Sequence, residues 1–477
     1  MVIISLAMGT RTKVILTAVI ILSIVAPTTR SATLGERIDA LLAHPRHKDV
    51  RFGICIIKAD SAVSVYRRRD TEPLIPASNM KVITTAAAVE LLKPDFEYHT
   101  KVGLCGETLV VLGSGDPLLG DDKTDSNYGR STGWVLDEIG LALTRRGVSR
   151  IKDIIVDSTV FDDQRTHPSW PADQLNRWYA CEVCGLNYNG NCVSITAVNN
   201  RSKVSILIEP PTSYLGITSK VKAITSGTNT IGSYRTAQPN RIVVFGRCKD
   251  RTPAIDVAIE KPAAFFGFLL AEHLAANGIR VTGDLLEKRV EPNCDMTVLK
   301  VFTHSLKDCL ARCNKDSFGL AAEALLKTIA ARSNPGKKNG SWSQGRKVLS
   351  EYLRRLGIDR REFYIDDGSG FSRNNRLSAN AIARVLLRMY HSDNWPMYRD
   401  SLAVGGRDGT IARYFREKKY RGRILGKTGY IRAVKSFSGV CTASGGDYIF
   451  SIIANGANGH TRDAINNIAK AIIDTAP

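Results

Sequence analysis

A serine and a lysine stand three positions apart in the N-terminal fifth of the chain. Ser78 and Lys81 follow Pro76, and the apolar run that continues to Leu92 is typical of a helix. Residues three apart share one face of a helix, so the Lys81 amine is expected within hydrogen-bonding reach of the Ser78 hydroxyl. An amine base beside a hydroxyl can activate it for acyl transfer, and the free N–H groups of a helix start can stabilise the resulting oxyanion.

The Ser-x-x-Lys spacing is not specific by itself. Ser149 with Lys152 and Ser219 with Lys222 fit the same template. Ser219 lies among alternating, strand-like residues and Ser149 follows a turn glycine, whereas Ser78 alone precedes a long helical run. Without further signals, Ser78 could equally be a helix-capping serine with an incidental lysine nearby.

A second chemical signal is the tripeptide Lys427-Thr428-Gly429, which occurs once. Its lysine could hold a substrate carboxylate, its threonine adds a hydroxyl, and its glycine lets a strand backbone approach a ligand closely. The simpler interpretation is an exposed turn before a strand. A second amine close to Lys81 would lower the pKa of Lys81, which a lysine base needs near neutral pH.

Composition narrows the class of protein. With 477 residues and 43% hydrophobic content, the chain can bury two or three domain cores. Its formal charge of +20 favours an anionic partner, but the basic residues are spread along the chain without the basic helix or aromatic-basic alternation of a nucleic-acid binder. An anionic envelope polymer or membrane surface is a better fit, and a merely solvated basic surface is the simpler alternative.

The N-terminus has the pattern of an export signal. Arg11 and Lys13 precede an apolar run from Val14 to Val25 and small residues at Ser31-Ala32. We predict a signal peptide at 1–32, with an uncleaved anchor as the alternative, and a mature protein in the periplasm or otherwise outside the cytoplasmic membrane.

Ten cysteines in an exported chain permit disulfides. Cys181, Cys184 and Cys192 cluster, as do Cys309 and Cys313. Neither cluster supplies the four ligands of a zinc site, so structural disulfides or buried thiols are favoured over zinc. The pairing does not follow from the sequence.

Periodicity predicts alternating helices and strands at both ends of the chain and mostly strands between them. The predicted helices are 34–42, 78–92, 262–277, 306–331, 343–356, 378–390 and 461–475, and the predicted strands are 51–57, 62–66, 109–112, 151–156, 204–208, 242–245, 279–282, 436–442 and 448–454.

Taken together, the motifs resemble a known family. Besides the Ser78 and Lys427 motifs they include Gly113-Ser114-Gly115-Asp116-Pro117, Leu186-Asn187-Tyr188-Asn189, Ser317 with Ala322-Glu323 following, Gly340-Ser341-Trp342, Asp367-Gly368-Ser369-Gly370 and Asp408-Gly409-Thr410. This set is similar to class C low-molecular-mass penicillin-binding proteins of the D-alanyl-D-alanine carboxypeptidase and endopeptidase type, and it spans nearly the whole mature chain.

The resemblance implies an α+β fold of the penicillin-binding transpeptidase-like or β-lactamase-like kind, an antiparallel sheet flanked by helices. It assigns 33–100 and 289–477 to one discontinuous hydrolase domain and 101–288 to a large, mostly β insertion.

The same resemblance assigns roles to individual residues. Ser78 would be the acylated nucleophile and Lys81 its base, and Ser317 would relay protons to the leaving group. Lys427, Thr428 and Gly429 would bind the substrate's terminal carboxylate. The backbone N–H groups of Ser78 and Tyr430 would form the oxyanion hole.

One position departs from the family pattern. The usual Ser-x-Asn reads Ser317-Phe318-Gly319 here, so the side-chain amide of the third residue is missing. Ser372-Arg373-Asn374 matches Ser-x-Asn literally but follows a separate family segment, so Ser317 is preferred. Loss of such a donor costs about 1 to 3 kcal/mol, which would slow catalysis without abolishing it.

The expected function is hydrolysis of peptidoglycan stem peptides through an acyl-enzyme on Ser78, without a metal or another cofactor. β-Lactams are expected to acylate the same serine. Two alternatives remain open at this point: a catalytically weakened peptidoglycan-binding protein, which Gly319 motivates, and a serine esterase or β-lactamase on the same site.

Overall fold

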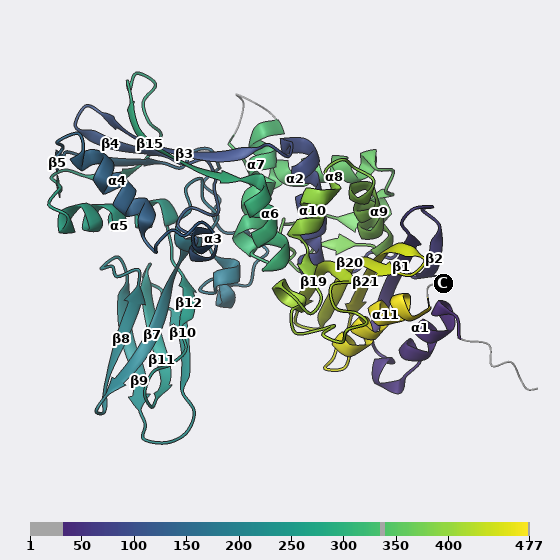
Figure 1. The fold of residues 1–477 in the computed structure, drawn as a ribbon. Coiled ribbons are helices and arrows are strands. Elements are labelled where there is room, and N and C mark those ends of the chain that lie inside the picture. Colours follow the sequence, from purple (N-terminus) through teal and green to yellow (C-terminus); the bar gives the residue numbers. More distant parts are fainter. Residues whose placement is uncertain (1–31, 334–338, 476–477) are drawn as a thin grey trace, which may run out of the picture.

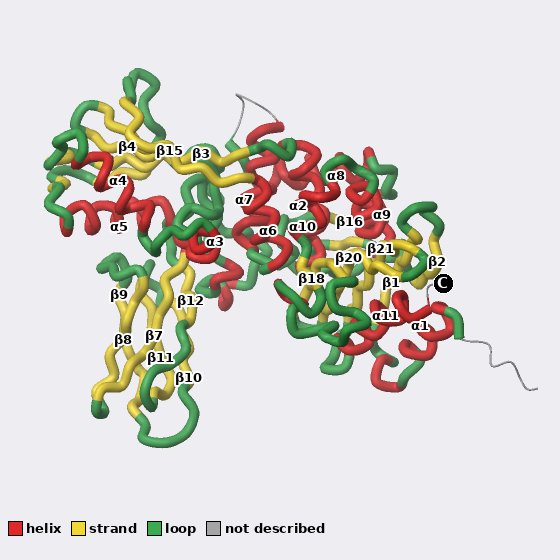
Figure 2. The backbone as a smooth tube through the Cα atoms, in the orientation of Figure 1, coloured by secondary structure: helices red, strands yellow, loops and turns green. Residues whose placement is uncertain are grey.

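The computed structural model describes residues 32–333 and 339–475, and the chain forms three parts (Figure 1). The first and last helices lie together in one part, while the middle of the chain forms two β-rich parts that extend away from it (Figure 2). Among the described residues, no helix combines the length and apolarity needed to cross a membrane. The predicted apolar leader segment, Val14 to Val25, lies outside the described residues.

The first part is built on a six-stranded antiparallel sheet in the order β18-β19-β20-β21-β1-β2. Its strands are β1 (Arg51–Lys58), β2 (Ser64–Arg68), β18 (Ala403–Val404), β19 (Ile424–Ile431), β20 (Val434–Ala443) and β21 (Gly446–Asn455). The central strands are almost continuously buried, as a sheet covered on both faces requires.

Helices cover both faces of this sheet. One apolar core joins α1 and α11 to one face, and a second joins the opposite face to α2, α9 and the helices behind them. The helices are α1 (Leu34–Leu42), α2 (Met80–Leu92), α6 (Leu306–Lys315), α7 (Gly319–Ser333), α8 (Trp342–Arg355), α9 (Ala379–Tyr390), α10 (Trp395–Ser401) and α11 (Thr461–Thr475), with the short ladder β16 (Phe363–Tyr364) and β17 (Arg376–Leu377) beside them. Because α2 is apolar around nearly its whole circumference, it lies at the centre of this layer.

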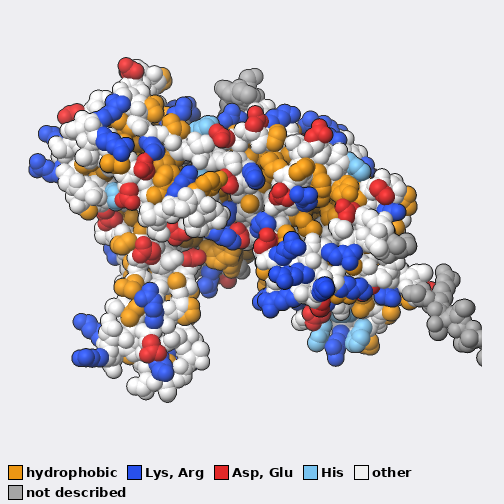
Figure 3. Space-filling model, viewed as in Figure 1, with side chains coloured by type: hydrophobic (Ala, Val, Ile, Leu, Met, Phe, Trp, Pro, Cys, Tyr) orange, Lys and Arg blue, Asp and Glu red, His pale blue; other side chains and the backbone are white. Residues whose placement is uncertain are grey.

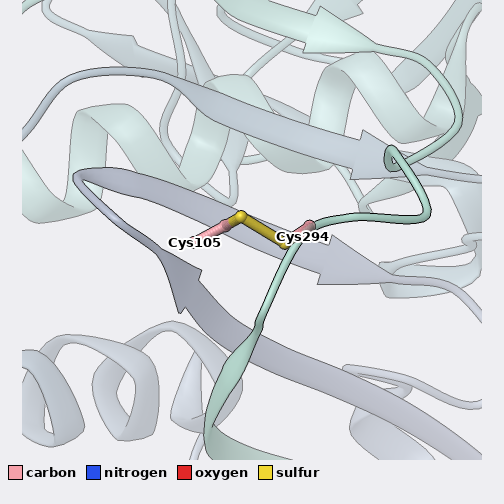
Figure 4. Close-up of a disulfide and its surroundings, with 2 residues drawn as sticks. All are labelled: Cys105 and Cys294. Carbon is pink, nitrogen blue, oxygen red and sulfur yellow. A yellow bond between two sulfur atoms is a disulfide. The ribbon is translucent and has the colours of Figure 1, made fainter.

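The second part is a five-stranded mixed sheet in the order β14-β6-β4-β3-β15, packed on two helices. Its elements are β3 (Glu97–Cys105), β4 (Thr108–Leu112), α3 (Asp122–Asn127), α4 (Trp134–Thr144), β5 (Arg150–Ile151), β6 (Ile154–Asp157), α5 (Pro262–Ala276), β13 (Arg280–Val281), β14 (Leu285–Glu287) and β15 (Thr297–Ser305). A disulfide between Cys105 and Cys294 joins the end of β3 to the segment before β15 (Figure 4). The other eight cysteines are free and buried.

The third part consists of two three-stranded sheets, β10-β11-β9 and β12-β7-β8. Its strands are β7 (Cys192–Asn200), β8 (Lys203–Glu209), β9 (Gly216–Ala223), β10 (Thr230–Arg235), β11 (Arg241–Cys248) and β12 (Ile255–Ala258). The predicted division of the chain at 100/101 and 288/289 remains a prediction, and β3 runs across the first of these positions.

Three sequence predictions need correction. The single helix predicted over 306–331 is wrong, because the chain breaks between α6 and α7 and Ser317 takes a left-handed φ of +62° in the break. The strand predicted over 62–66 is shifted to β2, since Ala62 has φ +56° in the preceding turn. The helix predicted from Ser78 starts as a 3-10 turn, Ala77–Asn79, before α2 begins at Met80. The class prediction, α+β with an antiparallel sheet flanked by helices, is confirmed.

Candidate active site

Three segments that are distant in sequence meet at the start of α2. They are the 3-10 turn Ala77–Asn79, the loop that ends at Gly370, and β19 around Gly429. A Cβ on Gly370 would lie 1.8 Å from the Ala77 carbonyl oxygen, and one on Gly429 would lie 3.0 Å from Ser78 N. Both glycines are therefore required for this close approach of backbones.

Lys81 lies beneath Ser78 and is almost completely buried. Its Nζ is 3.3 Å from Ser78 Oγ and donates to the Ser369 carbonyl oxygen at 2.7 Å. Burial lowers the pKa of the Lys81 amine, against the opposing fields of Cys313, Glu323 and Asp367. The arrangement provides a hydroxyl and an amine that gives up its proton more readily than an exposed lysine does.

The break between α6 and α7 brings Ser317 to a second buried amine. Lys427 Nζ donates to Ser317 Oγ at 2.8 Å and to the Thr428 carbonyl oxygen at 2.8 Å. Lys427 has no exposed surface, and burial together with the charge of Lys81 lowers its pKa well below the ordinary value. No carboxylate lies within ion-pair distance of Lys81 or Lys427 in the described structure.

A cavity of about 740 Å³ lies at this site. Ser78, Lys81, Ser317 and Tyr430 contribute to its wall, whereas Lys427, Thr428 and Gly429 do not. Lys427 lies behind Ser317, and Thr428 Oγ1 donates to Thr410 Oγ1 at 2.8 Å. Of the predicted substrate-binding residues, the structure therefore brings only Tyr430, whose side chain is 69% exposed, directly to the cavity.

The alternative middle-motif serine does not reach the cavity. Ser372 is buried, and its Oγ donates to Asp366 at 2.5 Å. Ser317 is thus the middle-motif candidate that lies near Ser78.

An aromatic wall faces the catalytic candidates, and sequence reasoning did not find it. It comes from Trp178 and Tyr179, on the 3-10 helix Trp178–Ala180, and from Phe371. A Cβ on Gly319 would lie 3.1 Å from the Tyr179 carbonyl oxygen, so this wall occupies the space beside the position where the family carries asparagine. In the sequence, only the unusual glycine at position 319 could have indicated this aromatic wall.

The cavity wall contains two arginines and no acidic residue. Arg373 and Arg432 both line it, and Arg373 Nη1 donates to the Arg432 carbonyl oxygen at 2.9 Å. In the described residues, no group of three or more His, Cys, Asp or Glu side chains is arranged to hold a metal ion.

Comparison with known proteins agrees with this geometry. A family model for the D-Ala-D-Ala carboxypeptidase 3 (S13) family matches residues 34–476. The chain belongs to this family. It is 29% identical over 457 residues to the D-alanyl-D-alanine carboxypeptidase of Actinomadura sp. strain R39. This match covers 90% of this chain and 82% of the relative. The resemblance to serine-type carboxypeptidases, and the hydrolase class it implies, are therefore confirmed.

Solved structures show the same fold. Penicillin binding protein 4 (dacB) from Haemophilus influenzae matches with a TM-score of 0.76 at 19% identity and covers 92% of this chain and 98% of its own. A predatory endopeptidase from Bdellovibrio bacteriovorus, in complex with an immunity protein, matches with a TM-score of 0.53 at 16% identity over 90% of this chain and 94% of its own.

The buried amines make a prediction about stability. The unfolded chain keeps a proton on Lys427 up to an ordinary pKa of about 10.4, whereas the folded chain binds it less tightly, so wild-type stability should rise with pH between these two values. In Lys427→Met this contribution is absent. We expect the free energy of unfolding of wild type, relative to the variant, to increase from pH 7 to pH 10 in urea titrations.

The matched control is Lys220→Met, which removes an exposed lysine on β9. Its stability should track that of wild type across the same pH range. Parallel curves for wild type and Lys427→Met would contradict a lowered pKa for Lys427.

Proposed function

We propose that Ser78 is the acylated nucleophile of a D-alanyl-D-alanine carboxypeptidase, and that it attacks the carbonyl carbon between two D-alanines of a peptidoglycan stem peptide. The observation that carries this proposal is the 3.3 Å contact between Lys81 Nζ and Ser78 Oγ inside the cavity. Lys81, when neutral, takes the hydroxyl proton as the oxygen attacks. The N–H groups of Ser78 and Tyr430 are proposed to bind the oxyanion.

The leaving group needs a proton as the C–N bond breaks. Ser317 and Lys427 form a hydrogen-bonded pair beside the nucleophile, and we propose that they relay the proton that Lys81 took from Ser78 to the departing D-alanine amine. Water then attacks the acyl carbon of the Ser78 ester, releases the shortened peptide and returns the proton to Ser78. Carboxylate binding by Lys427, Thr428 and Gly429 stays a prediction, since none of the three lines the cavity.

The same acylation extends to two further substrates. Cleavage of a D-alanine cross-link differs only in that the leaving amine belongs to a second stem peptide. β-Lactams present a reactive amide to the same hydroxyl, and the H. influenzae relative has been solved as a complex with a novel β-lactam. We propose that β-lactams acylate Ser78.

A fluorescent penicillin and a D-alanine release assay test this proposal together. Wild type should be labelled and should release D-alanine from a stem pentapeptide. Ser78→Ala should show neither labelling nor release, because it lacks the hydroxyl oxygen that forms the acyl ester. Release should fall by at least about 10⁴-fold, the loss typical of a missing nucleophile. A cross-linked dimer as substrate reports endopeptidase cleavage in the same assay.

Ser219→Ala is the control, since it removes the serine of another Ser-x-x-Lys match, on β9. It should behave as wild type does. Labelling of wild type without turnover of either peptide would favour the catalytically weakened binding protein. Absence of labelling in wild type, or labelling that persists in Ser78→Ala, would refute the assignment of Ser78 as the acylated nucleophile.

A basic surface beside the site supports a second proposal, contact with phosphate-bearing polyanions of the cell envelope. The loop 405–423 carries seven Lys and Arg against two acidic residues. Both acids pair with cations outside the loop, as Lys315 with Asp408 and Lys470 with Glu417. Of the seven cations only Lys419 lies within ion-pair distance of an acid in the described structure, and Figure 3 shows Lys and Arg side chains gathered over this part of the face. This contact presupposes export, which the predicted signal at 1–32 and the Cys105–Cys294 disulfide favour.

Charge reversal tests this surface. Arg416→Glu, Lys418→Glu and Arg421→Glu together should weaken salt-dependent binding to phosphatidylglycerol vesicles or to poly(glycerol phosphate) by at least about 100-fold, since each cation near an anionic surface contributes about 1 kcal/mol. The matched triple reversal of Lys203, Lys220 and Lys222, exposed on β8 and β9, should bind as wild type does. Vesicle binding alone assigns the membrane, polymer binding alone assigns the polymer, and binding to neither refutes the contact.

A further inference from the structure

A buried carboxylate lies beneath the floor of the cavity. Glu323, on α7, is 1% exposed and accepts three hydrogen bonds. Trp342 Nε1 donates to it at 2.8 Å, the backbone N–H of Gly368 at 2.9 Å and that of Ser369 at 2.7 Å. All three donors are themselves buried or held by helix packing, so the carboxylate has little freedom to move.

The two residues that supply the backbone donors also contact α2 through their carbonyl groups. The Ser369 carbonyl oxygen accepts from Lys81 Nζ at 2.7 Å, and the Gly368 carbonyl oxygen accepts from Thr84 Oγ1 at 2.7 Å. A Cβ on Gly368 would lie 2.8 Å from the Ala322 carbonyl oxygen, so α7 and this loop are in backbone contact. Glu323 thus holds Ser369 by its N–H, one peptide unit before the Ser369 carbonyl that accepts from the Lys81 amine.

Glu323 and the ionisable groups around it also act on the Lys81 amine electrostatically. The titratable groups near Glu323 and Lys81 come from five elements: Cys181 beside the Trp178–Ala180 turn, Cys313 on α6, Lys327 on α7, Asp367 in the loop and Lys427 on β19. Burial, and next the charge of Asp367, raise the pKa of Glu323 to about 7. Its ionised form raises the pKa of Lys81, against the lowering effect of burial.

We propose that Glu323 is a positioning residue for the acylation step: by binding the Ser369 N–H it holds the residue whose carbonyl accepts from Lys81, and its negative charge stabilises the protonated form of that amine. This inference rests on the proposed role of Lys81 as the base. Glu323 itself does not line the cavity and acts only through Ser369.

Glu323→Gln tests the proposal because it keeps the shape and removes the charge. One amide NH₂ then faces a backbone N–H, so residue 369 should shift together with its carbonyl, and the plateau rate of penicillin acylation should fall by at least about tenfold. Without the carboxylate, Lys81 loses its proton more easily. In a plot of the penicillin acylation rate against pH, the acidic limb should therefore move to lower pH. A purely structural role would lower the rate without moving the limb.

Glu362→Gln is the matched control. Glu362 is also a buried glutamate; it accepts from Ser378 Oγ at 2.5 Å and from Asn380 Nδ2 at 2.9 Å, away from the cavity. It should lower stability but leave the acidic limb where wild type has it. An unchanged rate and limb in Glu323→Gln, with wild type labelled and Ser78→Ala not, would overturn the positioning role alone.

If Glu323→Gln does not fold, a second variant tests the proposal. Glu323→Asp keeps the charge and shortens the side chain, so the plateau rate should fall while the acidic limb stays in place. If both rate and limb match wild type, the position of the carboxylate is irrelevant and the inference fails. If wild type itself is not acylated, the proposed function fails first.

Discussion

The site depends on the burial of two amines that have no acidic partner within ion-pair distance among residues 32–333 and 339–475. Lys81 and Lys427 are 2% and 0% exposed, and each Nζ donates to one backbone carbonyl and one serine hydroxyl. Burying a charged amine without an ion pair is costly, so the fold favours neutral amines at these positions. That cost is what turns two ordinary lysines into proton acceptors close to two hydroxyls.

The surrounding structure supports these amines through backbone contact. Gly370 and Gly429 remove the side chains that would separate three segments, and the break before α7 brings Ser317 to Lys427. Left-handed φ values at Ala77 and Ser317 occur on both sides of the site, where backbone strain of about 1 to 3 kcal/mol per residue must be offset by packing elsewhere. The neighbouring core around α2 supplies that packing.

Much of this could be predicted from particular residues. The helical run behind Ser78 predicted its contact with Lys81, and the apolar runs 436–442 and 448–454 predicted the paired strands β20 and β21. The position of Lys427 behind Ser317 could not be predicted, because it depends on the break at 316–318, and local helical periodicity runs straight through that break. The wall of Trp178 and Tyr179 was missed for a similar reason, since its approach to Gly319 is a contact between parts of the chain that no local pattern encodes.

The departure at Gly319 also takes on a different meaning in the structure. The missing asparagine first suggested a weakened site, but the backbone of Tyr179 fills the neighbouring space and the cavity remains bounded by Ser78, Lys81 and Ser317.

The most direct test of the account is the protonation state of the two buried amines. In protein labelled with ¹³C at lysine Cε, the resonances that Lys81→Met and Lys427→Met each remove should titrate below the ordinary lysine range of about 10.4 in NMR titrations, as those of Lys327 and Lys435, whose pKa values burial also lowers, should do. If the resonances of Lys81 and Lys427 titrate with the exposed lysines, the amines are charged at neutral pH and the account is contradicted.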